Sequence, residues 1–131
     1  MSINPQQYVP NEAWILFQLN EDPVQTISDG DVIVLAIMDV ASGLIHGMEF
    51  LPSGTEQLSE FESKTLLNSA EAKVGVRPKY LFVDATHRHD RLKRAATALG
   101  IKTVPEEGKN LDVITEEART GFVAHVKKGV R

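Results

Sequence analysis

The chain contains no cysteine in 131 residues. This absence excludes disulfides, thiolate metal sites and cysteine nucleophiles together, and it fits a reducing compartment. The sequence also has no apolar run of membrane-spanning length, and no basic segment precedes an apolar stretch near its N-terminus. We therefore expect a soluble cytoplasmic protein that does not enter the membrane.

Lysine and arginine are absent from the first 63 residues, which have ten acidic side chains. The remaining residues have fourteen basic and eight acidic side chains, so the two parts have formal charges of −10 and +6, and the whole chain has −4. Such an asymmetry occurs in proteins with a nucleic-acid-facing half. A simpler explanation is that the two parts neutralise each other within one fold or across a homo-oligomer.

Several motifs that would indicate a particular chemistry are also missing. The sequence has no glycine-rich phosphate loop, no Gly-x-Ser-x-Gly elbow and no recognisable serine–histidine–aspartate order. Aromatic residues make up only 6% of the chain, so it lacks the interleaved aromatics typical of single-stranded nucleic-acid binders. Carboxylates, histidines and one basic segment remain as candidates for a functional site.

The sequence does have a clear pattern of strands and helices. Apolar runs predict strands over residues 13–19, 32–38, 44–51, 80–83 and 101–104. Apolar stripes at helical spacing predict helices over residues 55–74, 89–99 and 111–126. We expect Ser53 or Thr55 to cap the first helix and Gly75 to end it. The run 32–38 is apolar without alternation, which predicts the central strand of the sheet, buried on both faces.

The predicted order is β-β-β-α-β-α-β-α. The first three strands predict an antiparallel meander, and the alternation after them predicts parallel strands joined by right-handed crossovers. We therefore expect one α/β domain over residues 13–126, with a five-stranded mixed sheet and helices packed on it. Residues 1–12 and 127–131 are expected to be loose ends of the chain.

This order resembles the ribonuclease H-like superfamily, and two stretches resemble its integrase and transposase cores. In LAIMDVASGLIHGMEFL an apolar strand ends in Asp, a short turn with Ser follows, and the next strand contains a Gly. In RPKYLFVDATHRHDRLKRAATALGIKTV a proline-led strand ends in Asp84 and leads into a helix that closes on Leu-Gly-Ile. The resemblance spans residues 13–126. The chain is also similar to a small bacterial family of this fold, which implies no function.

The resemblance implies a cluster of carboxylates that holds two Mg²⁺ or Mn²⁺ ions for phosphodiester chemistry. The family places an Asp in the first strand, an Asp at the end of the fourth strand, and a Glu or Asp on the last helix. Asp84 matches the fourth-strand position, and Glu116 or Glu117 matches the last-helix position. The first-strand position falls near Phe17 or Gln18, neither of which binds a metal well.

Because the first-strand carboxylate is missing, we predict a non-catalytic ribonuclease H-like module that binds or interacts with a partner and needs no cofactor. The alternative is a divergent metal-dependent nuclease or phosphodiesterase that uses Asp84 with Glu116 or Glu117 and with Mg²⁺ or Mn²⁺. Asp84 also has a purely structural interpretation, because Asp84 or Thr86 could cap the helix that follows.

Histidines next to Asp84 form a second candidate metal site. Their residue types suit Zn²⁺ or Mn²⁺, and the cluster consists of Asp84, His87, His89 and Asp90. The alternative is a capped helix start with exposed histidines. His46 and His125 fall on predicted strand and helix faces, where a hydrogen-bonded core histidine is the simpler expectation.

The predicted second helix has basic side chains at its start and along its polar face: Arg88, Arg91, Lys93 and Arg94. Such a patch can bind the phosphates of a nucleic acid through counterion release, or an acidic protein through charge complementarity. The alternative is an ordinary solvated helix face. We expect any electrostatic partner to bind at this helix.

Overall fold

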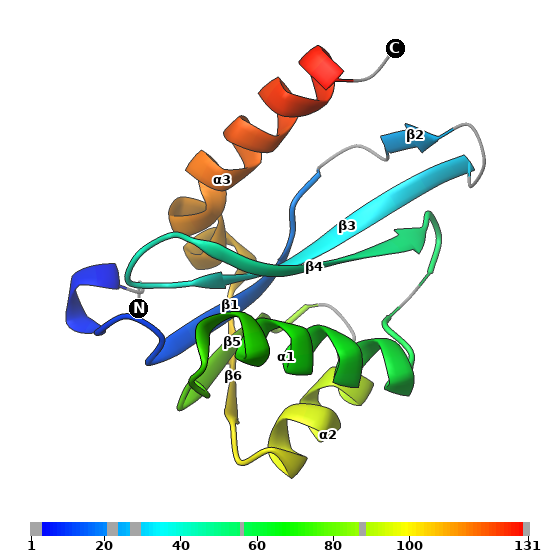
Figure 1. The fold of residues 1–131 in the computed structure, drawn as a ribbon. Helices are drawn as coiled ribbons and strands as arrows, with labels where there is room; N and C mark the ends of the chain where they lie inside the picture. Colours follow the sequence, from blue (N-terminus) through cyan, green and yellow to red (C-terminus); the bar gives the residue numbers. More distant parts are fainter. Residues whose placement is uncertain (1–3, 21–23, 27–29, 56, 87–88, 130–131) are drawn as a thin grey trace.

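A computed structural model describes residues 4–20, 24–26, 30–55, 57–86 and 89–129, and for residues 24–26 and 123–129 it describes the backbone only. Within these residues the chain forms six strands and three α-helices (Figure 1). The strands are β1 (Ala13–Gln18), β2 (Val24–Thr26), β3 (Gly30–Asp39), β4 (Ile45–Pro52), β5 (Tyr80–Asp84) and β6 (Lys102–Glu106). The helices are the 3₁₀ turn η1 (Pro5–Gln7), α1 (Glu60–Val74), α2 (Asp90–Ala98) and α3 (Gly108–Gly129).

The strands form one mixed sheet in the order β4-β3-β1-β5-β6. β3 pairs antiparallel with β4 and β1, while β1, β5 and β6 run parallel. β2 also pairs with β3, beyond the end of β1. The predicted α/β class and mixed sheet are confirmed, although β2 was not predicted because three residues are too few to show a strand pattern.

The predicted position of the apolar run 32–38 needs a correction. This run lies within β3, which is an interior strand, but β1 and not β3 occupies the middle of the sheet. Both strands are buried on both faces and read as continuous apolar runs, so hydrophobicity alone does not distinguish them.

Each face of the sheet has its own hydrophobic core. α1 and α2 cover one face and α3 lies on the other (Figure 1). Successive residues of β1 alternate between the two, so Trp14 and Leu16 pack with α1 and α2, while Ile15 and Phe17 pack with Leu111 of α3. This arrangement explains why the sequence of β1 has no polar alternation.

α1 begins later than the sequence predicts, at Glu60. Ser59 and Glu62 form a capping box, in which Glu62 N–H donates to Ser59 Oγ at 3.0 Å and Ser59 N–H donates to Glu62 Oε1 at 2.9 Å. The predicted caps Ser53 and Thr55 precede the helix, and this reciprocal pair of bonds fixes the start instead. Gly75 ends the helix with a φ of +77°, as predicted.

α2 is capped from a distant part of the chain. Its N-cap residue His89 makes no capping hydrogen bond, and Arg91 N–H donates instead to Gln57 Oε1 at 3.1 Å, from the loop before α1. Neither Asp84 nor Thr86, the two caps that the structural interpretation of the sequence offered, is the N-cap residue of α2. Asp84 Oδ1 accepts from Thr86 N–H at 2.9 Å and from Thr86 Oγ1 at 2.7 Å, which closes the turn after β5.

The described part of the N-terminal segment is hydrogen-bonded to itself and packed on the sheet. Asn4 Oδ1 accepts from Gln6 N–H at the start of η1. The Tyr8 ring meets the Phe82 ring edge-on, with centroids 6.0 Å apart. In the described part of the chain, no helix has both the length and the apolar character needed to cross a membrane.

Candidate functional site

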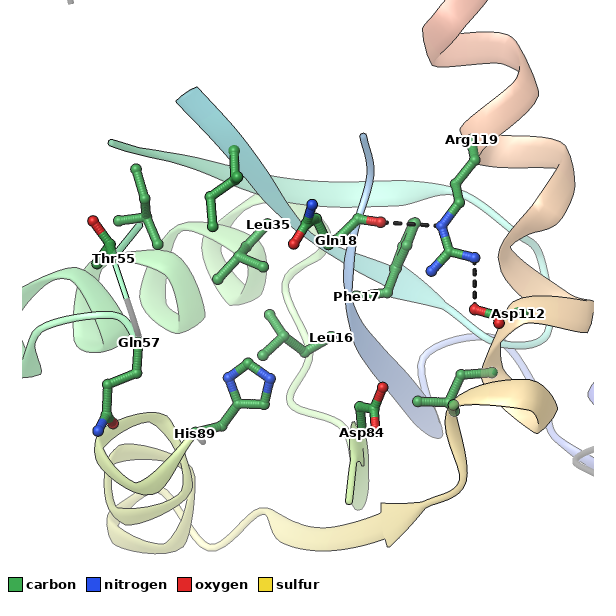
Figure 2. A pocket seen from close by; sticks show the side chains of 14 residues that line it. Leu16, Phe17, Gln18, Leu35, Thr55, Gln57, Asp84, His89, Asp112 and Arg119 are labelled. Carbon is green, nitrogen blue, oxygen red and sulfur yellow. Dashed lines mark hydrogen bonds and ion pairs between the residues drawn. The ribbon is translucent and has the colours of Figure 1, made fainter. Parts of the chain in front are cut away.

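A pocket of about 330 Å³ lies at the carboxyl ends of β1 and β5, where the start of α3 approaches them (Figure 2). Parallel neighbouring strands end at the same edge of a sheet, so these two ends necessarily lie together. The floor of the pocket is apolar, formed by Leu16, Ile33, Leu35 and Leu51. Its polar lining includes Thr55, Gln57, Asp84, His89, Asp112 and Arg119.

Asp84 is the last residue of β5, and its carboxylate points into this pocket (Figure 2). Gly108, at the start of α3, makes room for it. A Cβ atom at Gly108 would lie 2.9 Å from Asp84 Oδ2, a distance that real Cβ contacts essentially never show. A side chain at residue 108 would therefore require the Asp84 carboxylate to shift from this position.

Arg119 of α3 places a positive charge at the end of β1. Its Nε–H donates to the Gln18 carbonyl oxygen at 3.0 Å, and its Nη1–H donates to Asp112 Oδ1 at 2.8 Å (Figure 2). Its guanidinium carbon also lies 5.5 Å from the centroid of the Phe17 ring. The side chain is 19% exposed, so the guanidinium is largely removed from water.

Asp112 is the acidic residue of α3 that lines the pocket, whereas Glu116 and Glu117 are exposed and do not line it. Sequence reasoning did not single out Asp112, because it matched the acidic position of the last helix to Glu116 or Glu117. With the helix beginning at Gly108, Asp112 falls in its early turns, at the end that approaches Asp84.

The described residues do not fit a two-metal centre. They contain no group of three or more histidine, aspartate or glutamate side chains that could hold a metal ion. Mg²⁺ and Mn²⁺ prefer several oxygen ligands, but the pocket has an apolar floor, and the carboxylate of Asp112 is paired with Arg119. Two-metal chemistry would need further carboxylates at the end of β1, where Phe17 and Gln18 stand.

The predicted histidine cluster is only partly described. His87 lies outside the described residues, as does Arg88 of the basic patch. His89 is 8% exposed and lines the pocket, so the expectation that it is exposed was wrong. Asp90 is exposed at the first position of α2 and does not line the pocket.

Several solved structures of integrases are similar to this chain. A chain of the simian T-cell lymphotropic virus intasome, solved in complex with the PP2A regulatory subunit B56 gamma, matches with a TM-score of 0.62 and 16% identity. The match covers 93% of this chain and 43% of that chain, so this chain spans about two fifths of its length. The HTLV-2 integrase catalytic core in complex with magnesium, in its trimeric form, matches with a TM-score of 0.62 and 12% identity, covering 92% of this chain and 75% of that chain.

The BIV integrase catalytic core matches with a TM-score of 0.59 and 13% identity, and 92% of this chain and 74% of that chain are covered. The chain has the ribonuclease H-like fold of retroviral integrase cores. At these identities the likeness establishes the fold alone. No protein-family model matches the chain, and no curated protein matches its sequence.

The described residues of the predicted basic patch do not all line the same pocket in this ribonuclease H-like fold. Arg91 and Arg94 line a second pocket, between α1 and α2, together with Lys64. Lys93 is half-buried and does not line that pocket.

At the opposite end of β1, the ribonuclease H-like fold buries His46. Its Nε2 lies 2.9 Å from Asn11 Oδ1, and its ring meets the Trp14 ring at 5.7 Å between centroids. Burial lowers the pKa of His46, the Asp39 carboxylate opposes this effect, and the positive charge of Lys73 adds to it. The prediction of a hydrogen-bonded core histidine is confirmed for His46, while the side chain of His125 lies outside the described residues.

Proposed function

We propose that this chain is a non-catalytic ribonuclease H-like domain that acts as a binding module. The observation that carries the proposal is the position of Arg119. Its guanidinium lies at the carboxyl end of β1, where the family resemblance places a metal-binding carboxylate. The fold by itself assigns no activity, so the side chains at this position decide between the two functions.

Electrostatics supports this proposal. A divalent cation about 5 Å from a guanidinium is repelled by several kcal/mol at an effective dielectric constant of about 20. In the described part of the pocket the negative charges are those of Asp84 and Asp112, and Asp112 is already paired with Arg119 at 2.8 Å. Arg119 thus supplies internally the positive charge that metal ions would otherwise bring.

The alternative remains a divergent metal-dependent nuclease or phosphodiesterase. One observation favours it: Asp84 and Asp112 line one pocket at the carboxyl ends of neighbouring strands, although Glu116 and Glu117 do not. In that case Arg119 would have to release Asp112 before a metal ion could bind.

A cleavage assay distinguishes the two functions. Labelled single- and double-stranded DNA and RNA are incubated with the chain in Mg²⁺ or Mn²⁺, alongside the variants Asp84→Asn and Asp90→Asn. The second variant is the control, because Asp90 is an exposed acid outside the pocket. We expect all three proteins to show the same background. Metal-dependent cleavage that Asp84→Asn abolishes and Asp90→Asn retains would establish the nuclease instead.

A further inference from the structure

A groove of about 240 Å³ runs between α1 and α2, which lie side by side on one face of the sheet (Figure 1). α1 contributes Glu60 and Lys64, and α2 contributes Arg91, Arg94, Ala95 and Ala98. The packing of the two helices therefore brings Lys64 next to two arginines that follow it by about thirty residues in the sequence. No pattern within either helix predicts this combination.

The groove has an excess of positive charge. Lys64 Nζ lies 3.2 Å from Glu60 Oε1, but both side chains are mostly exposed, so solvent screens this pair strongly. Among the described residues, no ion pair or side-chain hydrogen bond engages the guanidinium of Arg91 or of Arg94. With three cations and one carboxylate, the lining has a formal charge of +2.

Two features of the groove define the anion that would fit it. Arg91 and Arg94 are three residues apart on one helix, so their side chains are neighbours on its surface. Each guanidinium can take a carboxylate through two parallel hydrogen bonds. Between them and α1, the short side chains of Ala95 and Ala98 leave space for a small apolar group to approach the helix.

A nucleic acid fits these features less well. The chain has a net charge of −4 and an isoelectric point of about 5.5, whereas nucleic-acid-binding domains are typically basic overall. Among the described residues that line the groove, none is aromatic, so there is no platform on which a base could stack. A long polyanion would also meet Glu60 within the groove itself.

We propose that the α1–α2 groove binds an acidic protein segment, with two carboxylates about one helical turn apart and a small apolar residue against Ala95 and Ala98. The assignment names the partner surface of the proposed module and to that extent rests on the proposed function. Cleavage activity is measured at a different pocket, so the two proposals succeed or fail in separate experiments.

The test is a titration of the ¹⁵N-labelled chain with poly-L-glutamate of about 20 residues, followed by NMR, with an oligothymidylate of equal length in parallel. Arg94→Glu is compared with Lys93→Glu, because the two variants reverse one charge at adjacent positions and only Arg94 lines the groove. Circular dichroism verifies that both variants are folded. Repeating the titration at high salt measures how much of the binding is electrostatic.

We expect saturable shifts at the amides of Lys64, Arg91, Arg94 and Ala98, and weaker binding at high salt. Arg94→Glu should raise the dissociation constant for poly-L-glutamate roughly tenfold, because it replaces an attraction with a repulsion, while Lys93→Glu should change it less than about twofold. Equal effects of the two variants, no saturable shift with poly-L-glutamate, or tighter binding of the oligothymidylate at the same amides would each overturn the proposal.

Discussion

The side chain of Arg119 makes three different interactions. A backbone carbonyl, a carboxylate and an aromatic ring all contact its guanidinium, and each contributes a modest free energy in isolation. Because the side chain is largely buried, its removal would also leave the Gln18 carbonyl oxygen without this donor. Arg119 therefore stabilises the fold at the position where the family resemblance places a metal ligand.

Replacing Arg119 with glutamine should lower the free energy of unfolding by about 1–3 kcal/mol, because it removes a hydrogen bond to a backbone oxygen together with an ion pair. Arg77→Gln is the matched control. Arg77 also bonds a carboxylate, of Glu71, and a carbonyl oxygen, of Leu99, but it is 45% exposed. In urea unfolding, Arg77→Gln should lower the free energy of unfolding by less than about 1 kcal/mol. A cost for Arg119→Gln no larger than that of the control would refute the assignment.

His46 should make the stability depend on pH. Burial holds its pKa below the ordinary value of 6.5, so the unfolded chain takes up a proton at a higher pH than the folded chain. Between these two pKa values the unfolded state binds more protons, and the stability falls as the pH falls. The contribution of neutral His46 to the free energy of unfolding is thus fully present above about pH 6.5 and is lost as the pH falls below this value.

The measurement is the urea midpoint at several values between about pH 7.5 and pH 5. The wild-type midpoint should fall more steeply than that of His46→Gln, in which the amide group can still donate to Asn11 Oδ1 but does not titrate. Other titrating groups contribute equally to both proteins. Parallel curves for the two proteins would show that His46 does not cause the pH dependence.

The helices begin where specific side chains satisfy their free N–H groups. The capping box of Ser59 and Glu62 fixes the start of α1, and Gln57, two residues earlier in the chain, caps α2. One short segment thereby contributes hydrogen bonds to the starts of both helices that line the groove. The same segment supplies Thr55 and Gln57 to the lining of the pocket.

Ser59→Ala should lower the free energy of unfolding by about 1 kcal/mol, because it removes the acceptor for the Glu62 N–H group. For a domain of this size the melting temperature should fall by roughly 3–5 °C. Ser53→Ala, at a cap that the sequence predicted but the structure does not use, should leave the melting temperature unchanged. Similar losses in the two variants would mean that the capping box does not determine where α1 begins.

At this scale the sequence predicts the kinds of elements well and their ends less well. Apolar runs revealed β1, β3 and β5, because burial on both faces leaves a plain hydrophobic signal. The sequence placed the start of α3 at residue 111, three residues after its observed start at Gly108.

At the scale of the whole molecule, the topology of the sheet forms the pocket, and the side chains determine its chemical character. The parallel pairing of β1 with β5 and the approach of α3 create a pocket at the carboxyl ends of these two strands. The side chains then give this pocket an apolar floor and an internal cation. The fold class was predictable from sequence, but the position of Arg119 was not, because its partner Gln18 is 101 residues away.

Part of the positive charge in the second half of the chain gathers in the α1–α2 groove of the folded molecule. Lys64, the first basic residue of the sequence, joins Arg91 and Arg94 in one groove. Sequence reasoning identified the basic helix but grouped its residues by proximity along the chain. The geometry of the helix separates Lys93 from Arg91 and Arg94, so Lys93 does not line the groove. The packing of α1 on α2 determines which basic residues line the groove together.

A thermal melt with and without about 10 mM Mg²⁺ or Mn²⁺ tests whether Arg119 takes the place of metal ions in this fold. A site with only two carboxylates among its described lining residues should bind with a dissociation constant of about 10 mM or weaker. The resulting stabilisation is at most about 0.4 kcal/mol, a rise in melting temperature of no more than about 2 °C. A site of about 0.1 mM would give about 2.7 kcal/mol and a rise of roughly 10 °C. A rise of that size that disappears in Asp84→Asn would contradict the account.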